Sequence, residues 1–159
     1  MTNPTDRQRI ASHLTHTRFL HIEDSLTLGK LRFFMGSFEA GRGARATAYA
    51  FMDLLDARVV LSDMSWGKPL EFRDFKGGKD AHQNLIARVL KIQTRQDRYW
   101  IELQNGPGEL IADGIIKPNG KPLTEISMPL TIFEGRKLAH ACLAYIAAWD
   151  VFGLQKISG

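Results

Sequence analysis

Alternation of apolar and polar residues dominates residues 31–66 and predicts three β-strands, at 31–39, 44–53 and 57–66. In the second of these segments, small apolar residues share one face and larger or charged residues share the other. The first face comprises Ala46, Ala48, Ala50 and Met52, and the second comprises Arg45, Thr47, Tyr49 and Phe51. The glycine-rich stretch 40–45 between the first two strands predicts a turn.

A second group of strands is predicted between residues 86 and 130. Residues 84–94 fit a helix or a strand, and their β-branched content favours the strand. Residues 98–104 alternate, with Tyr99, Ile101 and Leu103 on one face, and residues 105–108 (NGPG) give a strong turn signal. Further strands are expected in 109–117 and 124–130. Residues 66–80 contain four Gly or Pro positions and predict a loop or an irregular edge, whereas residues 1–30 have weak periodicity and predict a flexible arm.

The C-terminal segment predicts one long helix. Thr131 and Glu134 have the spacing of a capping box, and Gly153 stands where a helix stop is expected. Apolar residues between them surround the helix on nearly all sides, so a single small sheet would leave part of it uncovered. We therefore expect a homo-oligomer whose interface uses the larger side chains of this helix: Leu138, Cys142, Tyr145, Ile146 and Trp149.

The composition fits one globular domain of 159 residues, 44% of them hydrophobic. The net charge of +4 arises in residues 1–100, where 16 basic residues stand against 11 acidic ones. The single cysteine, Cys142, excludes an internal disulfide framework. No apolar run is long enough to cross a membrane, and the polar, charged first ten residues do not fit a secretory signal peptide, so we expect a cytoplasmic protein without membrane contact, nucleoid-associated if bacterial.

Candidate catalytic and metal-binding residues are sparse. His13, His16 and His21 cluster in the predicted arm, where nothing fixes the geometry that a metal requires. Several carboxylates could bind magnesium in a nuclease, although their spacing matches no known motif: Asp53, Asp56, Asp63, Glu71 and Asp74. No nucleophile, phosphate or dinucleotide motif is present, so we expect no enzyme activity, metal or cofactor.

Basic residues interleaved with aromatic ones give the clearest functional signal. Cations that follow phosphates and aromatic faces that stack on bases are the means by which proteins hold single strands. The candidate binding residues are Lys30, Arg32, Arg42, Arg45, Tyr49, Trp66, Lys68, Phe72, Arg73, Phe75, Lys76 and Lys79, with Arg98, Tyr99 and Trp100 as secondary candidates. The alternative is that the Phe residues and Trp100 belong to the core and the cations only solubilise the protein.

Residues 87–104 and 126–152 resemble the end of the Whirly family of single-stranded-DNA-binding proteins. In that family a β-meander leads into a Pro-x-Thr helix start, and the helix ends near a Trp-Asp pair. The matching positions are Pro129, Thr131, Glu134, Leu138, Ala141, Cys142, Ile146, Trp149 and Asp150. Residues 115–131 are also similar to the end of the sheet in the positive-cofactor-four fold. The family's Lys-Gly-Lys-Ala strand is absent as such, and the nearest candidates are residues 41–50 and 75–79.

The resemblance implies an α+β fold of two antiparallel β-sheets packed with helices, which assembles as a tetramer and lays single strands across the sheet edges. We therefore predict an arm at 1–30 and one Whirly-like domain at 31–159. The expected function is binding of single-stranded DNA with little sequence preference. The alternatives are an RNA-binding protein on the same fold, an assembly protein whose basic face meets a protein partner, and a metal-dependent nuclease.

Overall fold

The computed structural model describes residues 7–39 and 43–158. In chain order the elements are β1 (Arg9–Leu14), β2 (Arg18–Ser25), the short 3₁₀ helix η1 (Leu26–Leu28), β3 (Lys30–Glu39), β4 (Gly43–Asp53), α1 (Leu54–Ser65), β5 (Glu71–Lys79), β6 (Leu85–Arg95), β7 (Arg98–Ala112), β8 (Ile115–Pro118), β9 (Thr124–Thr131) and α2 (Ile132–Ser158).

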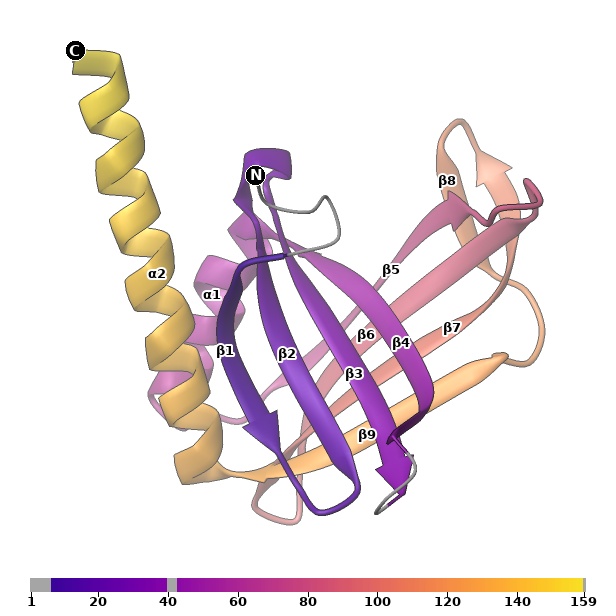
Figure 1. The fold of residues 1–159 in the computed structure, drawn as a ribbon, viewed down its shortest axis with the longest axis horizontal. Coiled ribbons are helices and arrows are strands. Elements are labelled where there is room, and N and C mark those ends of the chain that lie inside the picture. The colour runs from indigo at the N-terminus through magenta and orange to yellow at the C-terminus, as the bar shows by residue number, and fades with distance from the viewer. Residues whose placement is uncertain (1–6, 40–42, 159) are drawn as a thin grey trace.

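The strands form two antiparallel sheets whose strands cross at a steep angle (Figure 1). The first sheet has the order β1-β2-β3-β4, and the second has the order β5-β6-β7-β8 with β9 paired to the other side of β7. Helix α2 lies along one side of the pair of sheets, with α1 packed against it. The predicted α+β fold with two β-sheets and a long C-terminal helix is therefore confirmed.

Every second residue of the central strands enters one continuous hydrophobic core between the sheets and the helices. The predicted inner face of β4 is confirmed, because Ala48, Ala50 and Met52 are buried. The predicted face of β7 is confirmed as well: Tyr99, Ile101 and Leu103 have no exposed surface. Tyr99 is thus a core residue and not a nucleic-acid contact, and its hydroxyl donates to the Lys68 carbonyl at 2.7 Å.

The prediction of a flexible arm at residues 1–30 is wrong for its larger part. Residues 9–14 and 18–25 form strands β1 and β2 of the first sheet, with β1 at its edge and β2 between β1 and β3. Leu20 and Ile22 are fully buried, and β2 pairs with β3 along its whole length. Aromatic residues on the opposite face of β2 obscure its alternation, so the sequence pattern there is weak.

The strand predicted at residues 57–66 is instead helix α1. Its buried residues Ala57, Val60, Leu61 and Met64 have the i, i+3, i+4, i+7 spacing of one helix face. Val59 is 63% exposed, so its β-branched side chain adds to the strand signal without joining the core. The connection between the two sheets is therefore helical.

Two glycine-containing segments that were predicted as a loop or a turn form strands instead. Residues 71–79 form the regular edge strand β5, and β7 continues through residues 105–108 to Ala112. A Cβ atom on Gly77 would come within 2.2 Å of Ile116, and one on Gly108 within 2.5 Å. These two glycines leave room for β8 to pack over the end of the second sheet.

Helix α2 begins with the predicted capping box. The Thr131 N–H donates to Glu134 Oε1 at 2.9 Å, and the Glu134 N–H donates to Thr131 Oγ1 at 3.1 Å. The predicted stop at Gly153 is wrong, because α2 continues to Ser158. Its C-terminal turns run past the sheets (Figure 1). Within the described ranges, no helix combines the length and hydropathy needed to cross a membrane.

Candidate nucleic-acid interface

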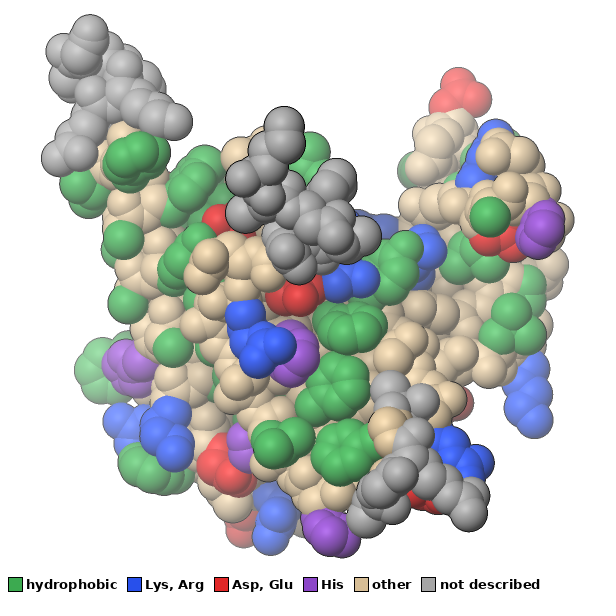
Figure 2. Space-filling view, viewed as in Figure 1, with side chains coloured by type: hydrophobic (Ala, Val, Ile, Leu, Met, Phe, Trp, Pro, Cys, Tyr) green, Lys and Arg blue, Asp and Glu red, His purple; other side chains and the backbone are tan. Residues whose placement is uncertain are grey.

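The outer face of the first sheet carries a group of aromatic side chains. Phe19 and His21 of β2 lie beside Phe34 and Phe38 of β3, and we call these four residues the aromatic face. The ring centroid of Phe19 lies 4.8 Å from that of His21, 5.5 Å from that of Phe34 and 6.4 Å from that of Phe38. Figure 2 shows hydrophobic side chains gathered over the strands of this sheet, with histidine and cationic side chains among them.

Gly36 leaves the space that the Phe19 ring occupies on the aromatic face. Gly36 lies opposite Phe19 in the β2–β3 ladder, and a Cβ atom at this position would come within 2.2 Å of the Phe19 ring. The ring therefore lies over the Gly36 backbone. A half-buried aromatic surface of this kind can stack on planar ligands.

Next to the aromatic face, Tyr49 of β4 lies between two guanidinium groups. The Arg32 guanidinium carbon is 4.4 Å from the Tyr49 ring centroid, and that of Arg88 is 4.3 Å from it. Arg88 also donates a hydrogen bond of 2.7 Å to the Tyr49 hydroxyl. Arg32 and Arg88 come from different sheets, so this Arg–Tyr–Arg stack spans the junction between them.

The two arginines differ in how their charges are compensated. Arg32 forms an ion pair with the buried carboxylate of Glu23. Arg88 has no carboxylate within ion-pair distance in the described part of the chain. The Nε atoms of both arginines are buried without a hydrogen-bond partner there. Arg88 therefore leaves one uncompensated positive charge beside an aromatic surface. Such a charge attracts an anionic ligand, and the adjacent rings can stack on its planar groups.

The histidine of the aromatic face favours its neutral form. Burial, followed by the positive charge of Arg9, lowers the pKa of His21, while Glu23 acts in the opposite direction. A neutral imidazole adds a planar ring to the surface without adding charge.

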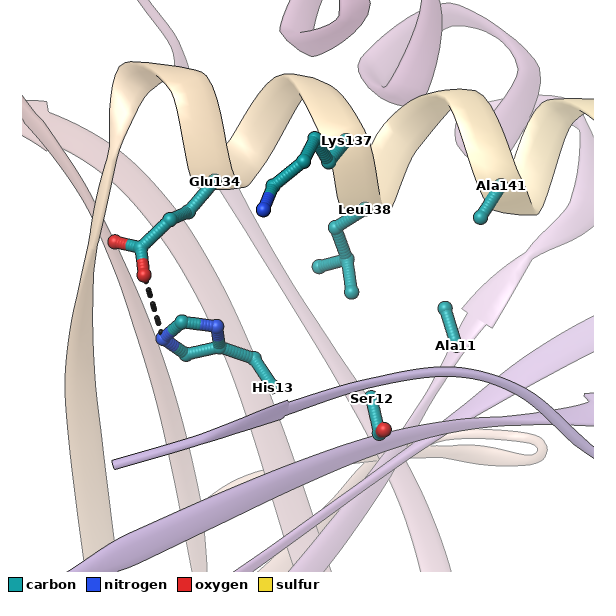
Figure 3. A pocket seen from close by; sticks show the side chains of 7 residues that line it. All are labelled: Ala11, Ser12, His13, Glu134, Lys137, Leu138 and Ala141. Atoms are coloured by element: carbon teal, nitrogen blue, oxygen red, sulfur yellow. Dashed lines mark ion pairs between the residues drawn. The ribbon is translucent and has the colours of Figure 1, made fainter. Parts of the chain in front are cut away.

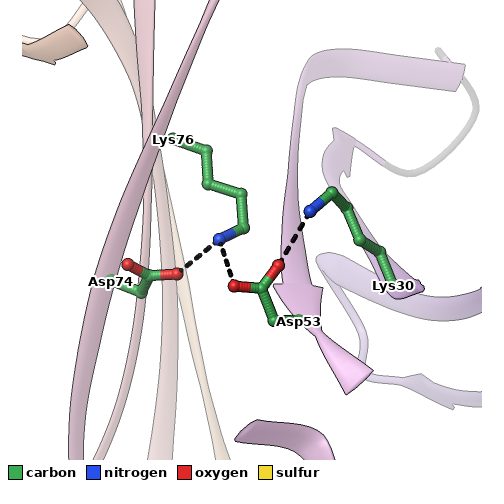
Figure 4. Close-up of polar contacts among 4 residues, drawn as sticks. All are labelled: Lys30, Asp53, Asp74 and Lys76. Atoms are coloured by element: carbon green, nitrogen blue, oxygen red, sulfur yellow. Dashed lines mark hydrogen bonds and ion pairs between the residues drawn. The ribbon is translucent and has the colours of Figure 1, made fainter. Parts of the chain in front are cut away.

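The structure brings together only some of the residues predicted from the sequence. Arg32 and Tyr49 join the Arg–Tyr–Arg stack, whereas Lys30 and Lys76 point into a cluster of carboxylates (Figure 4). Lys76 Nζ lies 2.8 Å from Asp74 Oδ2 and 3.0 Å from Asp53 Oδ2, and Lys30 Nζ lies 2.8 Å from Asp53 Oδ1. These two lysines therefore join β3 and β4 to β5.

The same cluster contains three of the carboxylates considered for magnesium. Asp53, Asp56 and Asp74 place oxygen atoms within 4.8 Å of one another, but both oxygens of Asp53 already bind ammonium groups. The hydrogen bond from Lys30 lowers the pKa of Asp53 most strongly. Burial opposes the charge of Lys76, yet its bonds to Asp74 and Asp53 raise its pKa above the ordinary value. Lys30, Lys76, Asp53 and Asp74 thus form an ion-pair network of two positive and two negative charges between the sheets.

The histidines of residues 13–21 do not converge on one point among the described residues. His21 lies in the aromatic face, while His13 Nε2 lies 3.4 Å from Glu134 Oε2 at the start of α2. Figure 3 shows this pair at one end of a pocket of about 290 Å³ between β1 and α2, also lined by Lys137 and Leu138. The pair fastens the edge strand β1 to the helix.

The remaining predicted contacts are dispersed. Trp66 and Lys68 are exposed after α1, next to the start of α2. Strand β5 carries Phe72, which packs against the core, and Arg73, whose guanidinium lies 5.9 Å from the Phe75 ring centroid. Lys79 is exposed at the end of β5, and Arg45 pairs with Glu39 at 2.7 Å. Arg42 lies outside the described residues.

Sequence reasoning missed Arg88, Phe19, His21 and Phe38 as site residues. Arg88 interrupts a row of inward-facing apolar positions in β6, at the place between Ile86 and Leu90. A cation in register with core positions is uncommon, and it is the one sequence signal that marks this site. The other three follow from the correct assignment of β2 and β3.

The residues predicted for an oligomer interface are largely covered by the protomer itself. Leu138, Cys142 and Ile146 are buried in its own core, and burial raises the pKa of the Cys142 thiol to about 12. Tyr145 and Trp149 are half-buried against the same core. The uncovered side of α2 instead carries small apolar residues with heptad-like spacing: Ala141, Ala144, Ala148 and Val151.

No protein-family model and no curated protein matches the sequence. The structure is similar to the crystal structure of WHY1 from Arabidopsis thaliana, with a TM-score of 0.59 over 93% of this chain and 90% of that chain. Sequence identity between the two chains is 13%. The fold is therefore Whirly-like over nearly the whole chain, including the first half, where the sequence resemblance is weakest.

Proposed function

We propose that this protein binds single-stranded nucleic acid, with DNA as the expected ligand and little preference for sequence. The observation that supports this most directly is the surface formed by the aromatic face and the adjoining Arg–Tyr–Arg stack. It combines several planar rings with an arginine, Arg88, that has no carboxylate partner among the described residues.

The physical basis is the one by which single strands bind without a sequence code. Every base has a π-face, and a base stacked on an aromatic side chain contributes about 1–3 kcal/mol. Arginine pairs with phosphate and also stacks on aromatic rings, so a strand crossing this surface would gain from both kinds of contact. No hydrogen bond to a particular base edge is needed, which accounts for the low sequence preference.

Double-stranded DNA is a poorer fit for the described surface. Readers of the major groove usually insert a helix that presents polar side chains to base edges. Helix α2 presents an apolar strip, and the uncovered side of α1 carries Leu55 and Val59. The proposed role is one of binding without catalysis.

We further propose that the protein is a homo-oligomer, with a tetramer as the expected form. The small residues on the uncovered side of α2 would allow two helices to approach closely. Val151 on the same side is 55% exposed, and burying it against a second copy would stabilise the assembly.

Fluorescence anisotropy with a labelled single-stranded DNA of about thirty nucleotides tests the proposal at low and moderate salt. We expect tight binding that duplex DNA does not displace and that weakens with salt, with a log–log slope of about −0.7 for each neutralised phosphate. Competition by RNA separates the DNA-binding function from RNA binding on the same fold. Absence of binding even at low salt would contradict the proposal and point to a protein partner.

A further inference from the structure

We propose that the outer face of the second sheet contains a separate pocket for one nucleobase, with the indole ring of Trp100 as its stacking surface. The pocket has a volume of about 630 Å³ and is lined by Arg95, Gln96, Trp100 and Ser127. This volume falls within the usual range of small-molecule sites. Because the pocket lies on a different sheet from the aromatic face, it can bind a base whether or not that face binds a strand.

The strand register explains why these side chains meet. Trp100 of β7 lies opposite Gln93 of β6 and Pro129 of β9, and it points away from the core into which Tyr99 and Ile101 point. Arg95 lies at the end of β6, and its guanidinium carbon is 5.7 Å from the indole centroid. A half-buried indole with a planar cation beside it offers both stacking and cation–π attraction to a heteroaromatic ring.

The pocket also offers hydrogen-bonding groups that have no partner in the described part of the protein. The Gln96 amide provides donors and an acceptor, and the Ser127 hydroxyl provides one donor and an acceptor. The polar edge of a nucleobase carries both types of group. A purely apolar ring would leave them unsatisfied, so the pocket suits a base better than a hydrocarbon.

The charge around the pocket favours a ligand that carries phosphate. Arg95 and Arg98 lie opposite each other across the hairpin turn formed by Gln96 and Asp97. Neither arginine has a carboxylate within ion-pair distance among the described residues, whereas the neighbouring Lys91 is paired with Glu102 at 3.2 Å. Two uncompensated guanidinium groups next to a stacking surface match a nucleotide, either free or as part of a strand.

Intrinsic fluorescence tests this site directly. In the double variant Trp66→Phe/Trp149→Phe, Trp100 is the remaining tryptophan, and its emission is followed during titration with AMP and, separately, with a short single-stranded oligonucleotide. We expect saturable quenching, and Arg95→Ala in the same background should weaken the binding about tenfold. The matched control keeps Trp66 instead, through Trp100→Phe/Trp149→Phe, and should show no quenching by AMP.

The two arms separate the sources of the base. Quenching by the oligonucleotide alone assigns the pocket to a base of a strand, and quenching by both ligands shows that free nucleotides enter as well. No quenching of Trp100 by either ligand would overturn the proposal. Anisotropy of the thirty-nucleotide strand separates failure of this proposal from failure of the proposed function. If the pocket binds no base, Trp100→Phe should bind the strand as the wild type does. If the protein binds no single strand, AMP should still quench the fluorescence of Trp100.

Discussion

The side-chain amide of Asn105 hydrogen-bonds both backbone groups of Tyr49. The Tyr49 N–H donates to Asn105 Oδ1 at 3.2 Å, and Asn105 Nδ2 donates to the Tyr49 carbonyl at 2.9 Å. Tyr49 lies on β4, the edge strand of the first sheet, whose unpaired backbone groups face β6 and β7 of the second sheet. Asn105 therefore satisfies the unpaired backbone groups of β4 at Tyr49. It also fixes the backbone that carries the central ring of the Arg–Tyr–Arg stack.

The first prediction concerns these two hydrogen bonds between Asn105 and Tyr49. Asn105→Ala removes both hydrogen bonds and leaves two half-buried backbone groups without partners, so the free energy of unfolding should fall by about 1–3 kcal/mol. Asn105→Asp should also destabilise, because a carboxylate accepts from the N–H but repels the carbonyl. Urea unfolding measures both variants, with the neighbouring outward-facing Gln104→Ala as control. Equal stability of Asn105→Ala and the control would show that the two Asn105–Tyr49 hydrogen bonds do not contribute to the free energy of unfolding.

The second prediction tests the role of Arg88 in nucleic-acid binding. Arg88→Ala should weaken binding of single-stranded DNA and reduce the magnitude of the salt slope by about 0.7, because one phosphate contact is lost. Arg88→Lys keeps the charge but loses planar stacking, so it should restore the slope more than the affinity. Lys137→Ala, on α2, serves as the matched loss of one cation. An unchanged affinity and slope in Arg88→Ala would make Arg88 a purely structural residue.

The third prediction compares two glycines of the same helix. A Cβ atom on Gly135 would come within 2.4 Å of the Tyr99 ring, whereas one on Gly153 would meet no atom within 4 Å. Gly135→Ala should therefore lower the free energy of unfolding by about 1–3 kcal/mol through overpacking. Gly153→Ala should raise it by about 0.5–1 kcal/mol, because alanine favours the helix. Thermal denaturation of both variants checks the opposite signs, and stabilisation by both would mean that α2 does not pack against Tyr99 as described.

The fourth prediction concerns acid sensitivity at the start of α2. The hydrogen bond from the Thr131 N–H chiefly lowers the pKa of Glu134 below its ordinary value, with a smaller contribution from His13. A lowered folded-state pKa stabilises the protein above the unfolded-state pKa, and this stabilisation is lost as the pH falls through the folded-state value. Glu134→Gln should thus lower the free energy of unfolding by about 1 kcal/mol near pH 7, and by progressively less as the pH falls into the acid range.

Urea unfolding of wild type and Glu134→Gln at several pH values measures this difference. The control Glu109→Gln removes an exposed carboxylate on β7 that lies 3.7 Å from Lys117 and caps no helix. A constant difference between wild type and Glu134→Gln across the acid range would contradict the prediction.

The fifth prediction separates the oligomer interface from the protomer core. Ala144→Asp places a carboxylate on the uncovered side of α2, so it should split the assembly while each protomer stays folded. Cys142→Asp places one in the core and should destabilise the protomer itself. Light scattering and circular dichroism distinguish these outcomes, with Ala112→Asp on the exposed end of β7 as control. An unchanged oligomer in Ala144→Asp would refute the interface on α2.

The parts of the fold whose signal is local could be predicted from the sequence. The alternation around Ala48 and Ala50, and that around Tyr99 and Ile101, identifies strands with one buried face, because side chains of a strand point alternately to its two sides. The capping box of Thr131 and Glu134 is local as well, since its bonds join residues three positions apart. The C-terminal helix and the two-sheet architecture follow from these patterns together with the family resemblance.

Which residues share a surface depends on contacts between elements far apart in the sequence. Residues 57–65 carry β-branched side chains, and contact with α2 and the sheets selects the helix. Tyr49 and Arg88 are thirty-nine positions apart, and no local pattern reports that β4 crosses the second sheet beside β6. The sequence determines how apolar residues repeat along each element. How two sheets pack determines where their edges and side chains meet, and that long-range geometry forms the candidate binding surface.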